Sequence, residues 1–141
     1  MKAPEDAVAA QWSEAARWLA RADEDATVAE LALTRDSPLT NRAAFHCQQA
    51  AEKMLKALLV AAGAAPPRSH DMELLIQAAA PLYPALRKGM PAFARLTEWL
   101  TASRYPDLGG ALGEAPANVA EMLALIKAFG ASVRALAPIR G

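Results

Sequence analysis

The segment from Arg42 to Ala62, RAAFHCQQAAEKMLKALLVAA, carries two stripes of side chains at the spacing of an α-helix. Along one stripe, small and apolar residues recur every three or four positions, as in a helix that is buried against its neighbours. Along the other, cations, an amide and a histidine recur at the same spacing. The apolar stripe consists of Ala44, Cys47, Ala51, Met54, Leu58 and Ala61, and the polar stripe of Arg42, His46, Gln49, Lys53 and Lys56. A helix needs only one buried stripe to fold, so the polar stripe is free to bind a phosphate, a nucleotide or an acidic partner, or simply to be solvated.

The residues before this segment predict a long helix that packs lengthwise against it. An unbroken apolar stripe that includes Trp12 indicates a helix from about Asp6 to Leu33. Ser37 is a favourable N-cap and Pro38 a favourable first helical residue, so we expect the next helix to start there.

The residues after Ala62 predict three further helices and no strand. Gly63 is a suitable C-cap for the central helix, and the prolines that follow prevent its continuation. The remaining expected elements are a third helix capped by Ser69 or Asp71, a fourth helix opened by Pro91 with Phe93, Leu96 and Leu100 in its core, a loop over residues 103–117, and a fifth helix over about residues 116–136. We therefore predict an all-α fold, a five-helix antiparallel up-and-down bundle in which residues 1–141 form one domain.

The charge of the chain is unevenly distributed, although its formal net charge is zero. Residues 1–36 hold four basic and eight acidic side chains, a net charge of −4, whereas residues 37–107 hold eight basic and five acidic ones, a net charge of +3. Any anion site is therefore expected in the middle of the chain. Binding to duplex DNA is not expected, because non-specific binding of that kind draws on many Lys and Arg contacts.

The single cysteine and the two histidines limit the chemistry that the chain can perform. Cys47 cannot form an intrachain disulfide, and its place on the apolar stripe predicts a buried thiol. Two distant histidines and a buried cysteine do not make a zinc site, so no metal or cofactor is expected. The N-terminus lacks a signal-peptide pattern and no apolar run reaches membrane-spanning length, so we expect a cytoplasmic protein.

Three segments resemble the HEPN-domain family in the expected order. Residues 45–59, FHCQQAAEKMLKALL, are similar to the second helix of that domain. Residues 66–75, PPRSHDMELL, resemble its P-x-T/S-H-D-L-x-x-L stretch, and residues 104–107, RYPD, resemble its R-Y-P-D signature before the last helix. The resemblance implies a small helical bundle, usually a homodimer. It also implies a nucleotide-binding role and, in bacteria and archaea, a minimal nucleotidyltransferase as partner in a toxin–antitoxin module.

Many HEPN proteins are metal-independent ribonucleases, and the resemblance would extend to that activity if their motif were present. The motif is Arg, four to six residues, then His near the last helix. Here Arg42 precedes His46 by only three intervening residues, Arg68 precedes His70 by one, and no histidine follows Arg104. An imidazole is needed to move the protons of the cleavage reaction, so no catalytic residue is assigned by the family pattern.

The polar stripe and the resemblance together predict a ligand site. We expect Lys53 and Arg104 to contact phosphate, His46 and Gln49 to contact other polar groups of the ligand, and Tyr105 to stack on a base. A supporting polar network is expected to contain Arg42, Gln48, Glu52, Lys56 and Asp107.

The same residues allow simpler structural interpretations. His46 is then a hydrogen-bonded histidine at a helix interface, the Gln48–Glu52 and Glu52–Lys56 pairs are surface contacts of little energetic value, and residues 104–107 form a structural turn.

Three functions remain open. The first is a nucleotide- or RNA-associated binding component that works with a minimal nucleotidyltransferase. The second is a protein-interaction module without a small ligand, in which the polar stripe docks on an acidic surface. The third is a ribonuclease with a catalytic set outside the family pattern, such as Arg104 with His46 or His70.

Overall fold

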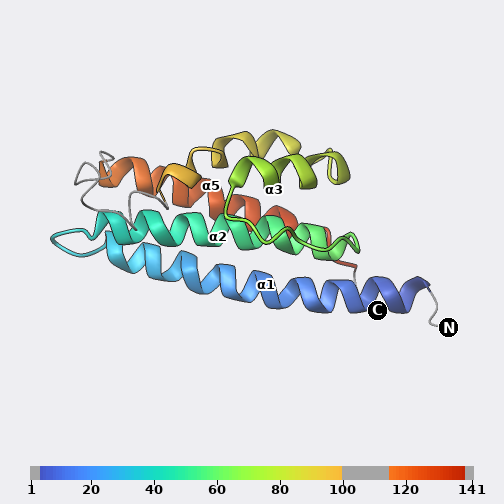
Figure 1. The fold of residues 1–141 in the computed structure, drawn as a ribbon. Coiled ribbons are helices and arrows are strands. Elements are labelled where there is room, and N and C mark those ends of the chain that lie inside the picture. Colours follow the sequence, from blue (N-terminus) through green and yellow to red (C-terminus); the bar gives the residue numbers. More distant parts are fainter. Residues whose placement is uncertain (1–3, 100–114, 139–141) are drawn as a thin grey trace.

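The computed structural model describes residues 4–99 and 115–138, and three long helices lie side by side along its length (Figure 1). They are α1 (Pro4–Leu33), α2 (Thr40–Ala61) and α5 (Pro116–Arg134). The shorter helix α3 (Met72–Ala79) is followed by three 3₁₀ turns, η1 (Ala80–Leu82), η2 (Arg87–Gly89) and η3 (Pro91–Phe93), and residues 96–99 are helical again. The described residues contain no strand, so the predicted all-α bundle is confirmed.

The segment that follows α2 sets the direction of α3 relative to α2. Helix α1 runs antiparallel to both α2 and α5 (Figure 1). Residues 62–71 run back along α2, because His70 contacts Glu52 near the middle of that helix. Helix α3 therefore starts again beside the middle of α2, and the Tyr83 hydroxyl beyond it donates to the Leu58 carbonyl at 2.8 Å. As a result α2, α3 and α5 share one direction, and the up-and-down alternation is interrupted between α2 and α3.

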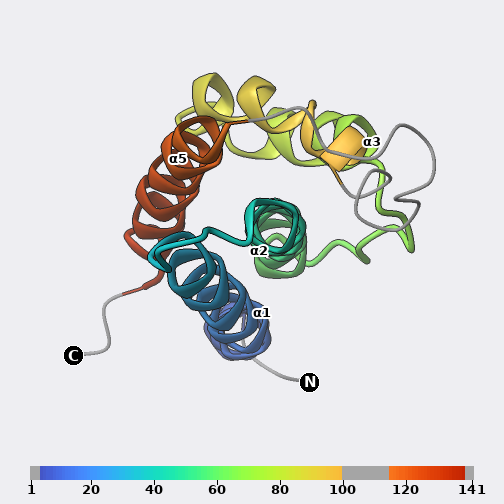
Figure 2. The same cartoon turned by 90° about the vertical axis from the view of Figure 1, so that its left-hand side faces the viewer.

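Helix α2 lies at the centre of the bundle, with α1, α3 and α5 around it (Figure 2). All six residues of its predicted apolar stripe are buried. The face of α1 that meets α2 is built largely of the smallest side chain, since alanines follow one another there at helical spacing. These buried alanines are Ala15, Ala22, Ala26, Ala29 and Ala32. Small side chains allow two helix backbones to approach closely.

The start of α2 differs from the prediction. The helix begins at Thr40, and Ser37 and Pro38 lie exposed before it, so the prediction that they cap and open the helix is wrong. Leu39 occupies the cap position, without a side-chain hydrogen bond. Its backbone N–H instead donates to the carbonyl of Ala32 at 2.9 Å, which ties the start of α2 to the last turn of α1.

The end of α2 and the start of α3 follow the sequence signals closely. Gly63 has a φ of +80°, and the N–H groups of Gly63 and Ala64 donate to the carbonyls of Val60 and Leu59, both at 2.9 Å, in a Schellman motif. Asp71 caps α3 by accepting from the N–H of Glu73 at 3.0 Å.

The fourth predicted helix is only partly observed. Pro91 opens the 3₁₀ turn η3 rather than an α-helix. Phe93 and Leu96 are buried as expected, while Leu100 and most of the predicted loop lie outside the described residues. Helix α5 ends at Arg134, before the predicted end at Leu136, which is exposed. None of the described helices is long and apolar enough to cross a lipid bilayer.

A polar cluster on the central helix as candidate functional site

Two carboxylates are buried beside α2, and each is contacted by one lysine and one histidine. Asp25 comes from α1 and Glu52 from α2 itself. Only 12% of the Asp25 side chain and 4% of the Glu52 side chain are accessible to solvent. Because a buried carboxylate is costly unless it is paired and hydrogen-bonded, their partners decide what this part of the molecule can do.

Asp25 connects α1 to the polar stripe of α2. His46 Nδ1 lies 2.8 Å from Asp25 Oδ1, and Lys53 Nζ donates to Asp25 Oδ2. His46 and Lys53 are seven residues apart, which is two helical turns, and therefore lie on the same face of α2. Both partners remain partly exposed, with 25% and 21% of their side-chain area accessible.

Glu52 gathers the second half of the cluster on the side of α2 that faces α3. Its Oε1 accepts from Gln48 Nε2 at 3.0 Å and lies 2.7 Å from His70 Nδ1. Its Oε2 accepts from Lys56 Nζ at 3.2 Å, and this lysine also lies over the ring of Trp18, 5.8 Å from its centroid. Both carboxylate oxygens are therefore satisfied within the protein.

A further hydrogen bond extends the Glu52 group towards the exposed side of α2. Gln49 Nε2 donates to Gln48 Oε1 at 2.6 Å. Gln49 and the Asp25 partners His46 and Lys53 belong to the same stripe, so the two halves of the cluster lie on adjoining parts of one polar face. We call these residues the α2 polar face: His46, Gln48, Gln49, Glu52, Lys53 and Lys56, with Asp25 and His70 as their partners from outside the helix.

The family model of the HEPN domain matches residues 15–134. The chain belongs to the HEPN domain family. No curated protein and no solved structure matches the chain. The matched range of the HEPN domain begins within α1, at Ala15, and ends at the last residue of α5, and it therefore contains both buried carboxylates and all of their partners.

The α2 polar face of this HEPN domain is balanced in charge. Asp25 and Glu52 offset Lys53 and Lys56, and no positive charge is left over when the two histidines are neutral. A neutral histidine that contacts a carboxylate through Nδ1 must carry its proton there, because the carboxylate can only accept. The Nε2 atoms of His46 and His70 are then the acceptors that the cluster leaves open.

The structure brings together six of the ten residues that the sequence analysis assigned to the HEPN site and its network. His46 is hydrogen-bonded at the α1–α2 interface, as its structural interpretation predicted. The Gln48–Glu52 and Glu52–Lys56 pairs are buried, so the interpretation of them as surface contacts is wrong. Lys53, which the sequence predicted as a phosphate contact, pairs with Asp25.

Four predicted residues do not take part in these contacts. Arg42 is exposed in the first turn of α2, and no described residue pairs with it. Arg104, Tyr105 and Asp107 lie outside the described residues, so their expected contacts with the HEPN polar face remain predictions.

Two contributors to the cluster were missed. Asp25 lies beside the alanine stripe of α1, three residues after Ala22 and next to Ala26. The position of Asp25 at the edge of a buried stripe was the signal that could have predicted a partner for it on the neighbouring helix. His70 was considered as a ribonuclease histidine and not as a partner of Glu52, because this contact depends on the return of residues 62–71 along α2.

Cys47 lies in the core of the HEPN domain and outside the cluster. The side chain is fully buried, and this burial raises the pKa of its thiol from 9.0 to about 12. The thiolate is the nucleophilic form of cysteine, so this side chain is inert at neutral pH. Within the described residues, no group of three or more histidine, cysteine, aspartate or glutamate side chains is placed to hold a metal ion.

Proposed function

We propose that this HEPN protein is the nucleotide- or RNA-associated binding component of a two-protein module with a minimal nucleotidyltransferase. The ligand contacts the exposed edge of the α2 polar face, where His46, Gln49 and Lys53 lie on one stripe. The observation that supports this proposal is the buried Asp25, which holds His46 and Lys53 in place from the neighbouring helix. Side chains that are fixed before binding lose less conformational entropy when a ligand arrives.

The charge balance of the face defines the kind of ligand. Lys53 has three donors and gives one to Asp25, which leaves two for a phosphate oxygen. The negative charge of Asp25 nevertheless offsets the lysine, so the face does not attract a polyanion strongly. We therefore propose a single nucleotide, or one nucleotide of an unpaired RNA segment, recognised mainly by hydrogen bonds. Arg104 and Tyr105 are assigned to the same ligand on the sequence alone.

A thermal-shift titration with ATP, GTP, AMP and a short single-stranded RNA tests this function. Binding to the folded state alone raises the melting temperature as ligand concentration rises. We expect Lys53→Ala and Gln49→Ala to reduce this rise, and Arg104→Ala to abolish it. Lys88→Ala is the matched control, because Lys88 is an exposed lysine of η2 away from the face. Equal shifts in all variants, or no shift with any ligand, would refute the assignment.

The salt dependence of binding separates a single nucleotide from a long nucleic acid. For a ligand with one contacted phosphate, the logarithm of the binding constant should fall with the logarithm of salt concentration with a slope of about −1 or shallower. A steep slope would show that many lysine and arginine contacts take part, contrary to the proposal. If no ligand binds and a nucleotidyltransferase still forms a complex, the face is a protein-docking module instead.

RNA cleavage is the second candidate function, and the way in which both histidines are held favours it. His46 and His70 each use Nδ1 for a carboxylate, and an imidazole oriented in this way presents Nε2 as a proton acceptor. The test is cleavage of single-stranded RNA in the presence of a metal chelator, with His46→Asn and His70→Asn beside the natural chain. Fragments formed equally by all three proteins would exclude a role for these histidines.

A further inference from the structure

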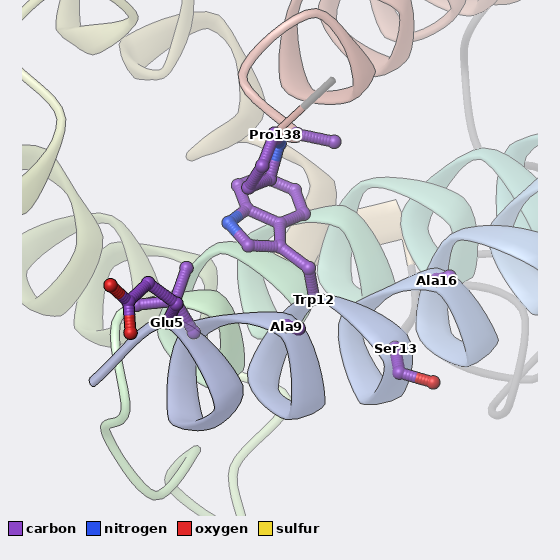
Figure 3. Close-up of a pocket in the computed structure, with 8 residues that line it drawn as sticks. Glu5, Ala9, Trp12, Ser13, Ala16 and Pro138 are labelled. Atoms are coloured by element: carbon purple, nitrogen blue, oxygen red, sulfur yellow. The ribbon is translucent and has the colours of Figure 1, made fainter. Parts of the chain in front are cut away.

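A cavity lies between the first turns of α1 and the chain just after α5. None of its lining residues belongs to the α2 polar face. The cavity has a volume of about 610 Å³, which falls within the range of about 300–1,000 Å³ that is usual for ligand pockets. Its walls come from α1 and from the chain just after α5, at Ala137 and Pro138. Figure 3 shows the indole of Trp12 extending from α1 towards Pro138.

The walls of this cavity are apolar, and they contain one unused hydrogen-bond donor. Val8 is 41% exposed, although it continues the apolar stripe of α1. No described residue accepts a hydrogen bond from the indole N–H of Trp12. Trp12 is only partly buried, and no buried side-chain N or O atom of the described residues lacks a partner, so this N–H is open to solvent and can donate to an occupant of the cavity. Tryptophan is enriched at protein interfaces because it combines an apolar ring with such a donor. A peptide carbonyl is the acceptor that every protein partner can offer.

The cavity carries one negative charge among its apolar walls. Glu5 lines it, and the neighbouring Asp6 is also exposed, whereas Glu14 lies on the opposite side of α1. No described cation pairs with Glu5 or Asp6, and residues 4–16 contain no lysine or arginine. Figure 3 shows Glu5 on the same side of α1 as Trp12, two turns earlier. An occupant should therefore combine an apolar side chain with a neighbouring positive charge.

We propose that this cavity binds a basic, apolar peptide segment of another protein. An aliphatic or aromatic side chain of the segment enters the cavity beside Trp12, a lysine or arginine next to it pairs with Glu5, and a backbone carbonyl accepts from the Trp12 indole. A second copy of the chain fits less well, because a two-fold contact would present the same lining twice, and this lining contains no lysine or arginine to pair with Glu5. The site is separate from the α2 polar face, so it does not depend on the ligand proposed there.

Selection from a library of random dodecapeptides tests the proposal without a known partner. The library is displayed on phage and selected on the full chain and, in parallel, on the Ala9→Arg variant. Ala9 is an exposed residue that lines the cavity, so arginine there fills the cavity and offsets the charge of Glu5 without disturbing the core. We expect peptides with a lysine or arginine beside a large apolar residue to be enriched on the natural chain and absent from the variant.

Synthetic versions of the enriched peptides then give the size of the effect. By fluorescence anisotropy, Trp12→Ala and Glu5→Lys should each weaken binding by at least about tenfold. Glu24→Lys is the matched control, because Glu24 is an exposed acid of α1 that does not line the cavity, and it should leave binding unchanged within about twofold. Ala9→Arg keeps the test valid if Trp12→Ala fails to fold.

Three outcomes would overturn the proposal. One is that the enriched peptides are acidic or uncharged. Another is that selection on the natural chain enriches nothing that the Ala9→Arg variant does not also bind. The third is a self-associated chain that becomes monomeric in the Ala9→Arg variant, as measured by light scattering, because the cavity would then hold a second copy.

Discussion

Asp25 shows how one buried charge can fix the relation of two helices. Its two oxygens are divided between His46 and Lys53, which belong to the opposite helix. A buried ion pair contributes little when it is compared with apolar residues of the same volume, but removal of one partner leaves an uncompensated charge in a poorly solvated place. Removal of one partner therefore destabilises the protein by more than the ion pair stabilises it.

Replacement of Asp25 by asparagine should destabilise the protein clearly. The variant keeps the shape of the side chain but leaves Lys53 and His46 without their carboxylate, and we expect a loss of about 2–3 kcal/mol in the free energy of unfolding. Asp23→Asn is the control, because Asp23 pairs with Arg134 while 56% of its side chain is exposed, and it should cost less than about 1 kcal/mol. Urea unfolding measures both, and equal losses would contradict the prediction.

The Cys47 thiol gives a stability effect at high pH. In the unfolded chain it ionises near pH 9.0, whereas burial raises its folded pKa to about 12. The unfolded state therefore loses this proton first. The contribution of the neutral thiol is complete below pH 9 and is lost as pH rises towards 12, by about 1.4 kcal/mol for each pH unit.

Between about pH 8 and about pH 10.5, the natural chain should lose about 2 kcal/mol more of its free energy of unfolding than Cys47→Ala does. Urea unfolding of both proteins at both pH values measures this. Lysines and tyrosines titrate in both proteins, so their contributions cancel in the comparison. If both proteins lose the same stability over this interval, the thiol of the folded protein ionises in its ordinary range.

Helices as elements were accessible from the sequence because their signals are local. The apolar stripe of α2, the glycine after it and the acid before α3 each act within a few residues, and the structure confirms them. The start of α2 was not accessible in this way. Its position depends on the backbone hydrogen bond from Leu39 to Ala32, which forms only when α1 and α2 already lie beside each other.

Gly63 is the position where the end of α2 depends most on residue type. Its φ of +80° is costly for any side chain with a Cβ, and an alanine Cβ there would also lie 2.9 Å from Gln11 Nε2. Gly63→Ala should therefore lower the free energy of unfolding by roughly 1 kcal/mol, even though Gln11 can move aside. Thermal unfolding measures the change.

Gly89→Ala is the matched control for that substitution. Gly89 does not have a positive φ, and an added Cβ would lie at an ordinary distance of 3.5 Å from Phe129. We expect a change close to zero or slightly stabilising. Equal destabilisation by both substitutions would show that the backbone conformation at residue 63 is not the cause.

The whole molecule is where sequence reasoning reached its limit. It identified the polar residues of α2 but not their partners Asp25 and His70, which lie 21 and 18 residues away from the side chains they contact. Such contacts depend on which helices become neighbours and in which direction the connecting segment runs. Periodicity within one helix carries no information on either point.

The docking of α5 on the rest of the bundle can be tested at Gly130. An added Cβ there would lie 2.8 Å from Met54 Cε of α2, so this glycine marks a close approach of the two helices. Gly130→Leu should push α5 away from α2 and destabilise the protein by about 1–3 kcal/mol. Ala131→Leu is the control, since Ala131 is its exposed neighbour, and urea unfolding should detect almost no change. A larger loss for Ala131→Leu would contradict this view of the contact.

The alanine-lined seam between α1 and α2 has a consequence for the evolution of the protein. Its residues are already the smallest that a helix tolerates well, so nearly every substitution there adds volume to a closely packed interface without room for it. The seam should therefore accept very few replacements over evolutionary time. A survey of tolerated substitutions would mark it as strongly as a reactive centre, although its only task is to let two backbones come close.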